Sequence, residues 1–91
     1  MGVLLAIAPN GNGYPVDGVF AGTDAAAKGV AAGDLIVAID GQPLSSLGAV
    51  EAAMLLSGTV GSTKMMEFGV TASVALSGQT VAIRVDELLP P

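Results

Sequence analysis

Short apolar runs separated by glycine and polar turn residues recur along the chain. The clearest run is Leu35–Ile39, which Gly33-Asp34 precedes and Asp40-Gly41 follows. Five apolar residues, rich in β-branched side chains and bounded in this way, predict a strand that is buried on both faces. Asp40-Gly41 predicts a tight turn, because glycine adopts a positive φ without strain. We expect Asp34 to accept backbone hydrogen bonds at the preceding corner.

Two apolar runs near the N-terminus predict a hairpin. Val3–Ala8 and Tyr14–Phe20 read as strands, and Pro9–Gly13 between them contains two glycines and an asparagine pair typical of a turn. Pro15 lies near the start of the second strand, where a missing N–H is tolerated.

Two alternating runs near the C-terminus predict another strand pair. Lys64–Val70 places Met66, Phe68 and Val70 on one side, and Thr80–Leu88 places Val81, Ile83 and Val85 on one side. Ser77-Gly78 is the expected turn before the last strand. The segment Thr71–Leu76 fits either a loop or an extension of the preceding strand.

A short helix is predicted at Ala25–Lys28. Thr23 or Asp24 can cap its start, because a short side-chain oxygen accepts from a backbone N–H of the first turn. Gly29 favours a stop at its end.

A second helix is predicted from about Leu47 to Leu56, with Ser45 or Ser46 as its cap. The spacing of Leu47, Val50 and Met54, with Ala53 beside them, predicts one apolar face.

The composition indicates one small domain over residues 1–91. Hydrophobic residues make up 52% of the chain but aromatic residues only 3%, so aliphatic side chains must build the core. No apolar stretch approaches the length that crosses a bilayer, and Met1–Leu5 lacks the basic region of a signal peptide. We therefore expect neither a membrane span nor a signal peptide.

The titratable residues exclude several classes of function. Eight carboxylates stand against Lys28, Lys64 and Arg84, so no basic cluster can neutralise a nucleic-acid backbone. Without Cys or His, the chain has no disulfide and no Ser-His-Asp or Cys-His device. The dispersed carboxylates predict no metal site. We expect no cofactor and no enzymatic activity of the chain's own.

The segment Gly22–Leu44 resembles the core signature of PDZ domains, which are peptide-binding modules. Their bacterial forms commonly read Gly-Ser-Pro-Ala-Ala-x-x-Gly-Leu-x-x-Gly-Asp-x-Ile-x-x-Ile-(Asn or Asp)-Gly. The matching residues here are Gly22, Thr23, Asp24, Ala25, Ala26, Gly29, Val30, Gly33, Asp34, Ile36, Ile39, Asp40 and Gly41.

The resemblance implies an α+β fold, a small PDZ-like partly open β-barrel or sandwich of five to six strands capped by two helices. The chain opens directly at Gly2-Val3 and adds a strand at Thr80–Leu88, so one strand has moved from the front to the back. This permuted order resembles that of bacterial protease-associated PDZ domains, in which the last strand takes the place of the missing first one.

The resemblance also implies where a peptide would bind. The ligand would add as a strand beside Val3–Ala8, facing the second helix. The backbone amides of Gly2, Val3 and Leu4 could meet a terminal carboxylate, although only half of the family's loop motif is present. Ala49 stands where many relatives place a histidine, and the resulting apolar wall favours hydrophobic ligand side chains. The implied peptide-binding residues are Gly2, Val3, Leu4, Leu5, Ala6, Ile7, Ala49, Ala53 and Leu56.

Two functions follow from the resemblance. The first is a non-catalytic domain that recruits C-terminal or extended peptides with apolar side chains by β-augmentation, within a bacterial envelope protease in the periplasm or cell envelope. The second is a structural or assembly module of a secretion or other envelope complex, with other domains of a parent protein as its partners. For Leu56, packing in the core is as consistent with the pattern as a role in the site.

Overall fold

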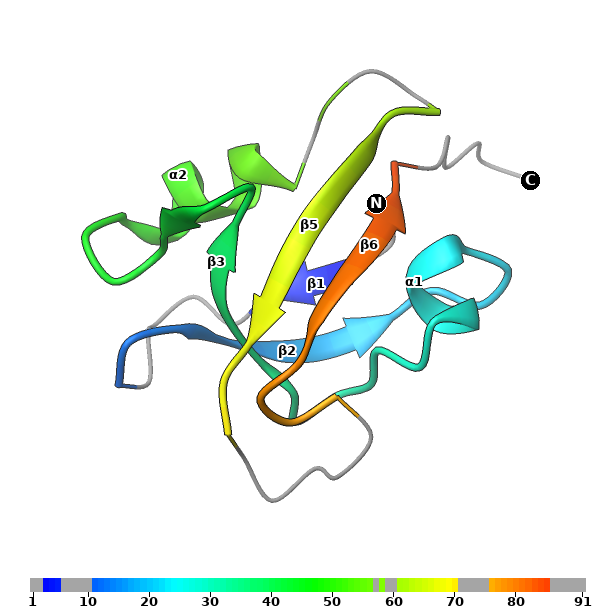
Figure 1. Cartoon of the computed structure of the whole chain (residues 1–91), viewed down its shortest axis with the longest axis horizontal. Helices are drawn as coiled ribbons and strands as arrows, with labels where there is room; N and C mark the ends of the chain where they lie inside the picture. Colours follow the sequence, from blue (N-terminus) through cyan, green and yellow to red (C-terminus); the bar gives the residue numbers. More distant parts are fainter. Residues whose placement is uncertain (1–2, 6–10, 57, 59–60, 71–75, 86–91) are drawn as a thin grey trace.

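Within the residues that the structure describes, the chain forms a sheet and two short helices (Figure 1). The computed structural model describes residues 3–5, 11–56, 58, 61–70 and 76–85. The strands are β1 (Val3–Leu5), β2 (Tyr14–Val19), β3 (Leu35–Ile39), β4 (Gln42–Pro43), β5 (Thr63–Phe68) and β6 (Thr80–Arg84), and the helices are α1 (Asp24–Ala27) and α2 (Ala49–Leu55). This architecture confirms the expected α+β class.

The strand order in the sheet is β1-β2-β3-β5-β6, and β4 pairs with β3 outside this path. All described pairings are antiparallel. The two expected strand pairs form, since β1 pairs with β2 and β6 pairs with β5 over its full length. The C-terminal strand therefore lies at one end of the sheet and β1 at the other.

The predicted strand Leu35–Ile39 forms with these bounds as β3. Ile36, Ala38 and Ile39 are buried, whereas Leu35 and Val37 are only half-buried, so burial on the second face is partial. Asp40 and Gly41 both have positive φ, 51° and 81°, as the predicted tight turn requires.

Other predicted strand ends differ from those in the structure or lie outside the described residues. Val70 is 84% exposed, because β5 ends at Phe68 and the alternation that buries Met66 and Phe68 does not continue. The prediction that Val70 shares their buried side was wrong. The predicted strand residues 6–8 and 86–88, and the undecided residues 71–75, lie outside the described residues.

Helix α1 is capped as predicted by Thr23. Its hydroxyl accepts from the N–H of Ala26 at 3.3 Å and donates to the carbonyl of Phe20 at 2.7 Å. Gly29 follows the helix with a φ of 92°, the left-handed conformation typical of a helix stop.

Helix α2 differs from its prediction in start and face. It begins at Ala49 with Gly48 as N-cap and no side-chain cap, so the prediction of Ser45 or Ser46 was wrong. Ala52 and Leu56, one turn apart, face the core. Val50 and Met54 lie on the opposite face and are 74% and 67% exposed, so the predicted apolar face was also wrong for these two residues.

A hydrogen-bonded corner, in which Asp34 is buried, joins β2 to the segment before β3. The Asp34 carboxylate accepts from the N–H of Ala31 at 2.9 Å, as expected for a structural role. The N–H of Gly33 donates to the carbonyl of Val16 at 2.9 Å, and the N–H of Val16 donates to the carbonyl of Asp34 at 2.7 Å. Gly33 has a φ of 98°, which this corner requires.

Candidate functional site

The outer edge of β1 is the first feature of the candidate site. In the described sheet β1 is the terminal strand and pairs with β2 alone. A terminal strand presents backbone N–H and C=O groups with which another strand can pair. The register shifts between Leu4 and Leu5, where a bulge interrupts the ladder. Such irregularities increase local twist and are common beside binding sites.

The structure places only some of the predicted site residues of this strand. Val3, Leu4 and Leu5 form β1, and the half-buried Val3 packs against the main core cluster. Gly2, Ala6 and Ile7 lie outside the described residues. Their part in the site stays a prediction.

Helix α2 carries the other predicted site residues. Ala49 is half-buried and packs against the same core cluster as Val3, while Ala53 is exposed. Leu56 is only 6% exposed and is itself a member of the core. Ala53 is therefore the accessible member of the three predicted site residues of α2, and Ala49 is partly accessible.

A buried tyrosine fixes the segment that leads into α2. The hydroxyl of Tyr14, at the start of β2, donates to the carbonyl of Leu47 at 2.6 Å. This bond connects residues 33 positions apart and holds the start of α2 against the sheet. The sequence prediction missed this role, although a buried tyrosine generally needs a partner for its hydroxyl.

The family model of the PDZ domain matches residues 16–68, which include α1, β3, β4, α2 and β5. The chain belongs to the PDZ domain family. PDZ domains are peptide-binding modules of protein–protein interaction. The assignment agrees with the resemblance carried by Gly22–Leu44.

A solved structure supports the same fold. This PDZ domain is similar to a PDZ domain protein from Parabacteroides distasonis ATCC 8503, with a TM-score of 0.72 and 17% sequence identity. The similarity covers 91% of this chain but 19% of that protein, so the chain spans about a fifth of its length. A search of curated proteins found no match.

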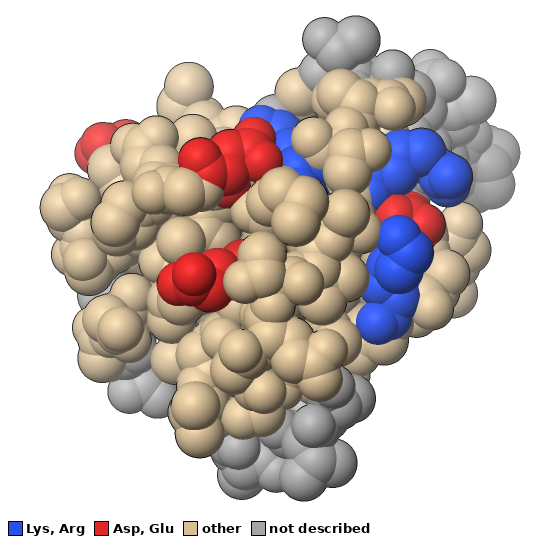
Figure 2. All heavy atoms as spheres, viewed as in Figure 1, with Lys and Arg blue, Asp and Glu red and all other residues tan. Residues whose placement is uncertain are grey.

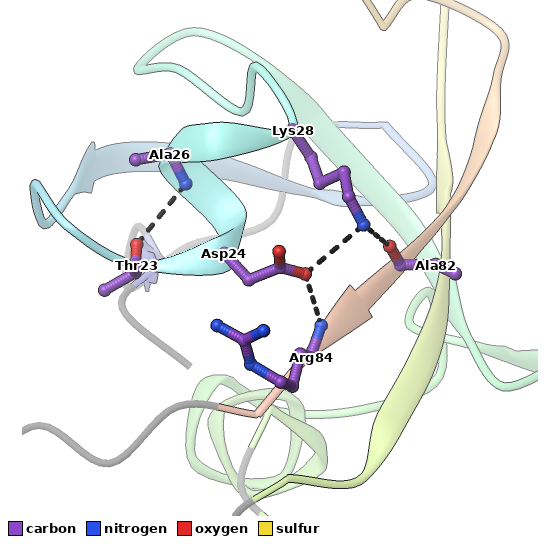
Figure 3. A network of polar contacts seen from close by, with 6 residues as sticks. All are labelled: Thr23, Asp24, Ala26, Lys28, Ala82 and Arg84. Atoms are coloured by element: carbon purple, nitrogen blue, oxygen red, sulfur yellow. Dashed lines mark hydrogen bonds and ion pairs between the residues drawn. The ribbon is translucent and has the colours of Figure 1, made fainter.

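The opposite edge of the PDZ sheet, formed by β6, is contacted by the side chains of Asp24 in α1 and of Lys28, the residue that follows α1 (Figure 3). The Asp24 carboxylate accepts from the backbone N–H of Arg84 at 2.8 Å. The Lys28 ammonium donates to the carbonyl of Ala82 at 2.9 Å and lies 3.4 Å from the same Asp24 oxygen. Figure 2 shows this group of contacts as basic side chains around an acidic one, on the side of the molecule where α1 and β6 lie.

These contacts change the acidity of Asp24. The N–H of Arg84 that donates to its carboxylate holds the pKa of Asp24 below the ordinary value of 3.8. Partial burial opposes this effect, and the hydrogen bond and positive charge of Lys28 reinforce it. Asp24 is therefore a charged acceptor at neutral pH.

The described residues contain neither a metal-binding cluster nor a membrane-spanning helix. Among them, no three His, Cys, Asp or Glu side chains gather where they could hold a metal ion. None of the helices found there has the length and apolar character needed to cross a membrane.

Proposed function

We propose that this PDZ domain binds extended peptide segments as an additional strand on the outer edge of β1, with α2 beside the ligand. The observation that carries the proposal is the terminal position of β1 in the described sheet. A peptide added there would pair its backbone with β1, and the side chains on either side would select the sequence.

The side chains of the proposed site favour apolar ligands. Val3 and Ala49 offer half-buried apolar surface, and the exposed Ala53 leaves room beside it. No charged or hydrogen-bonding side chain is available at Ala49 to select a hydroxyl. Leu56 would contribute through the core behind this surface, because it is almost wholly buried.

A weak preference for a ligand with a free C-terminus is part of the proposal. The amides of Gly2, Val3 and Leu4 would bind a terminal carboxylate, and Leu5, Ala6 and Ile7 would continue the strand. Because the sequence contains only half of the family's carboxylate-binding motif, we expect a weak preference for a free carboxylate over an internal segment.

The domain is further proposed to recruit substrates for a larger bacterial envelope protease. Two observations support this placement. The C-terminal strand β6 pairs with β5 at one end of the sheet, which agrees with the permuted strand order that the resemblance implies, and the Parabacteroides distasonis protein is much longer than the domain it shares. The periplasm or cell envelope is the corresponding location.

A peptide-library screen followed by one pair of variants tests the binding proposal. Ala53→Phe should fill the space beside β1 and abolish detectable binding, since affinities of such small sites are about micromolar, or roughly −8 kcal/mol. Ala27→Phe is the matched control, because Ala27, like Ala53, is an exposed helical alanine and lies in α1. Both variants should keep the cooperative unfolding transition of the wild type.

Three results would contradict the proposal. The first is a folded Ala53→Phe variant that binds the selected peptides as tightly as the wild type. The second is equal loss of binding in Ala27→Phe. The third is a combination of two findings: the library yields no ligand, and a second domain of the parent protein occupies the β1 edge. That combination would indicate an assembly module.

A further inference from the structure

The backbone groups of β6 divide between its two edges. The N–H of Val85 donates to the carbonyl of Ser62, and the carbonyl of Val85 accepts from the N–H of Gly61. The carbonyl of Gln79 accepts from the N–H of Phe68. Odd-numbered residues thus direct their backbone groups toward β5 and its flanks. Because this direction alternates along a strand, the even-numbered residues present theirs at the outer edge.

Asp24 and Lys28 occupy part of that outer edge. Asp24 accepts from the N–H of Arg84, and Lys28 donates to the carbonyl of Ala82. One residue of a neighbouring parallel strand would make this same pair of bonds, with its C=O accepting from one group and its N–H donating to the other. The two side chains therefore take the place of a strand residue opposite Ile83.

The helical spacing of Asp24 and Lys28 and the anchoring of α1 in the core hold this pair of side chains in place. Asp24 and Lys28 are four residues apart, the spacing at which side chains meet on a helix. Ala25, between them, is wholly buried in the core, and Thr23 caps the helix. The Asp24 side chain is only 14% exposed, so water competes weakly for its contacts.

We infer that Asp24 and Lys28 close the β6 edge against the addition of another strand, and that opening it allows β6 to pair with β6 of a second copy of this chain. Two copies can meet there about a two-fold axis, which makes an antiparallel pair of identical strands. In a pair centred on Ala82, Arg84 of one copy lies opposite Thr80 of the other. Like charges are then not directly opposed, which would otherwise destabilise the pair.

The inference is tested with the double variant Asp24→Ala/Lys28→Ala in sedimentation equilibrium. The wild type should keep its monomer mass of 8.9 kDa as concentration rises, whereas the double variant should shift toward twice that mass. Glu51→Ala/Lys64→Ala is the matched control, because it removes one acidic and one basic residue elsewhere and should stay monomeric. A folded double variant that remains monomeric, or a control that associates equally, would overturn the inference.

Amide hydrogen exchange provides a second readout that does not depend on the double variant folding. In the dilute wild type, the Arg84 amide should be protected to an extent similar to the Ile83 amide. Asp24→Ala should speed its exchange about tenfold or more, as expected for losing a hydrogen bond to a charged group. Asp24→Asn, which keeps an acceptor oxygen, should restore part of the protection. A wild-type Arg84 amide that exchanges as fast as an unstructured peptide would also overturn the inference.

Discussion

The two ends of this PDZ sheet are completed in different ways. At β6, the side chains of Asp24 and Lys28, at the start and just past the end of α1, bind outward backbone groups of Ala82 and Arg84. At β1, the strand pairs with β2 on one side, and Val3 of β1 and Ala49 of α2 pack against the same core cluster. One edge is thus bonded within the domain by charged side chains, while the other is the edge proposed to bind a ligand.

The difference shows how a small sheet can direct strand addition to one place. Exposed terminal strands promote unwanted pairing between molecules, and charged residues at the edge are a common protection. In this domain the charged pair stands at β6, and the peptide-binding role is proposed for β1.

The largest effect is expected from deleting residues 80–91, which removes β6. Ile83 is wholly buried and β6 pairs with β5 along its full length, so the deletion exposes core surface and leaves backbone groups without partners. We expect loss of the cooperative thermal transition measured by circular dichroism. Truncation after Val85 separates the contribution of β6 from that of the residues that follow it. A deletion variant with a transition near the wild-type temperature would mean that β6 is an appendage to the sheet.

An intermediate effect is expected from Gly33→Val, which strains the corner that supports β2 and, through it, β1. No atom lies within 4 Å of the position of an added Cβ, so the cost comes from the backbone, whose φ of 98° disfavours a β-branched residue. We expect a loss of about 1–3 kcal/mol in the free energy of unfolding, measured with urea. Gly18→Val is a useful control, because its added Cβ also meets open space but its φ is not positive. Unchanged stability of Gly33→Val would contradict the assigned corner.

The smallest effect on stability is expected from removing the charge of Asp24 at the β6 edge, either by mutation or by lowering the pH. Its pKa is lowered in the folded state, so its ionised form stabilises the fold above the ordinary value of 3.8, and this contribution is lost as the pH falls through the lowered value. The wild type should be more stable than Asp24→Asn at neutral pH, and the gap should close in acid below pH 3.8. Urea unfolding of both proteins across this range measures it. A gap that is constant with pH would show that the charge of Asp24 does not contribute.

Local signals in the sequence predicted the parts of the fold that depend on neighbouring residues. The strand Leu35–Ile39 and the cap at Thr23 each follow from a few adjacent side chains. The sequence predicted where helix α2 lies along the chain but not which of its faces is buried. Nearly every residue of Ala49–Leu56 is apolar, so periodicity cannot choose among them. Only packing shows that Ala52 faces inward while Val50 faces outward.

The candidate site was predicted less completely than the fold. Ala49 and Ala53 have no chemical signature of their own, and they were assigned through the resemblance to PDZ domains. The contact between Asp24 and Arg84 joins residues 60 positions apart, and no local pattern connects them. The bond from Tyr14 to Leu47 was missed for the same reason, since its acceptor is a backbone carbonyl that any residue could provide.

The most direct test of the account is a map of backbone amide shifts while a selected peptide is titrated into the isotope-labelled domain. The largest shifts should fall on Val3–Leu5 and on α2 near Ala49 and Ala53, and the amides of β6 should change little. Repeating the titration with the C-terminally amidated peptide measures the carboxylate preference, which we expect to be weak. Shifts concentrated on β6, or confined to surfaces away from both β1 and α2, would contradict the assignment of β1 as the peptide-binding edge.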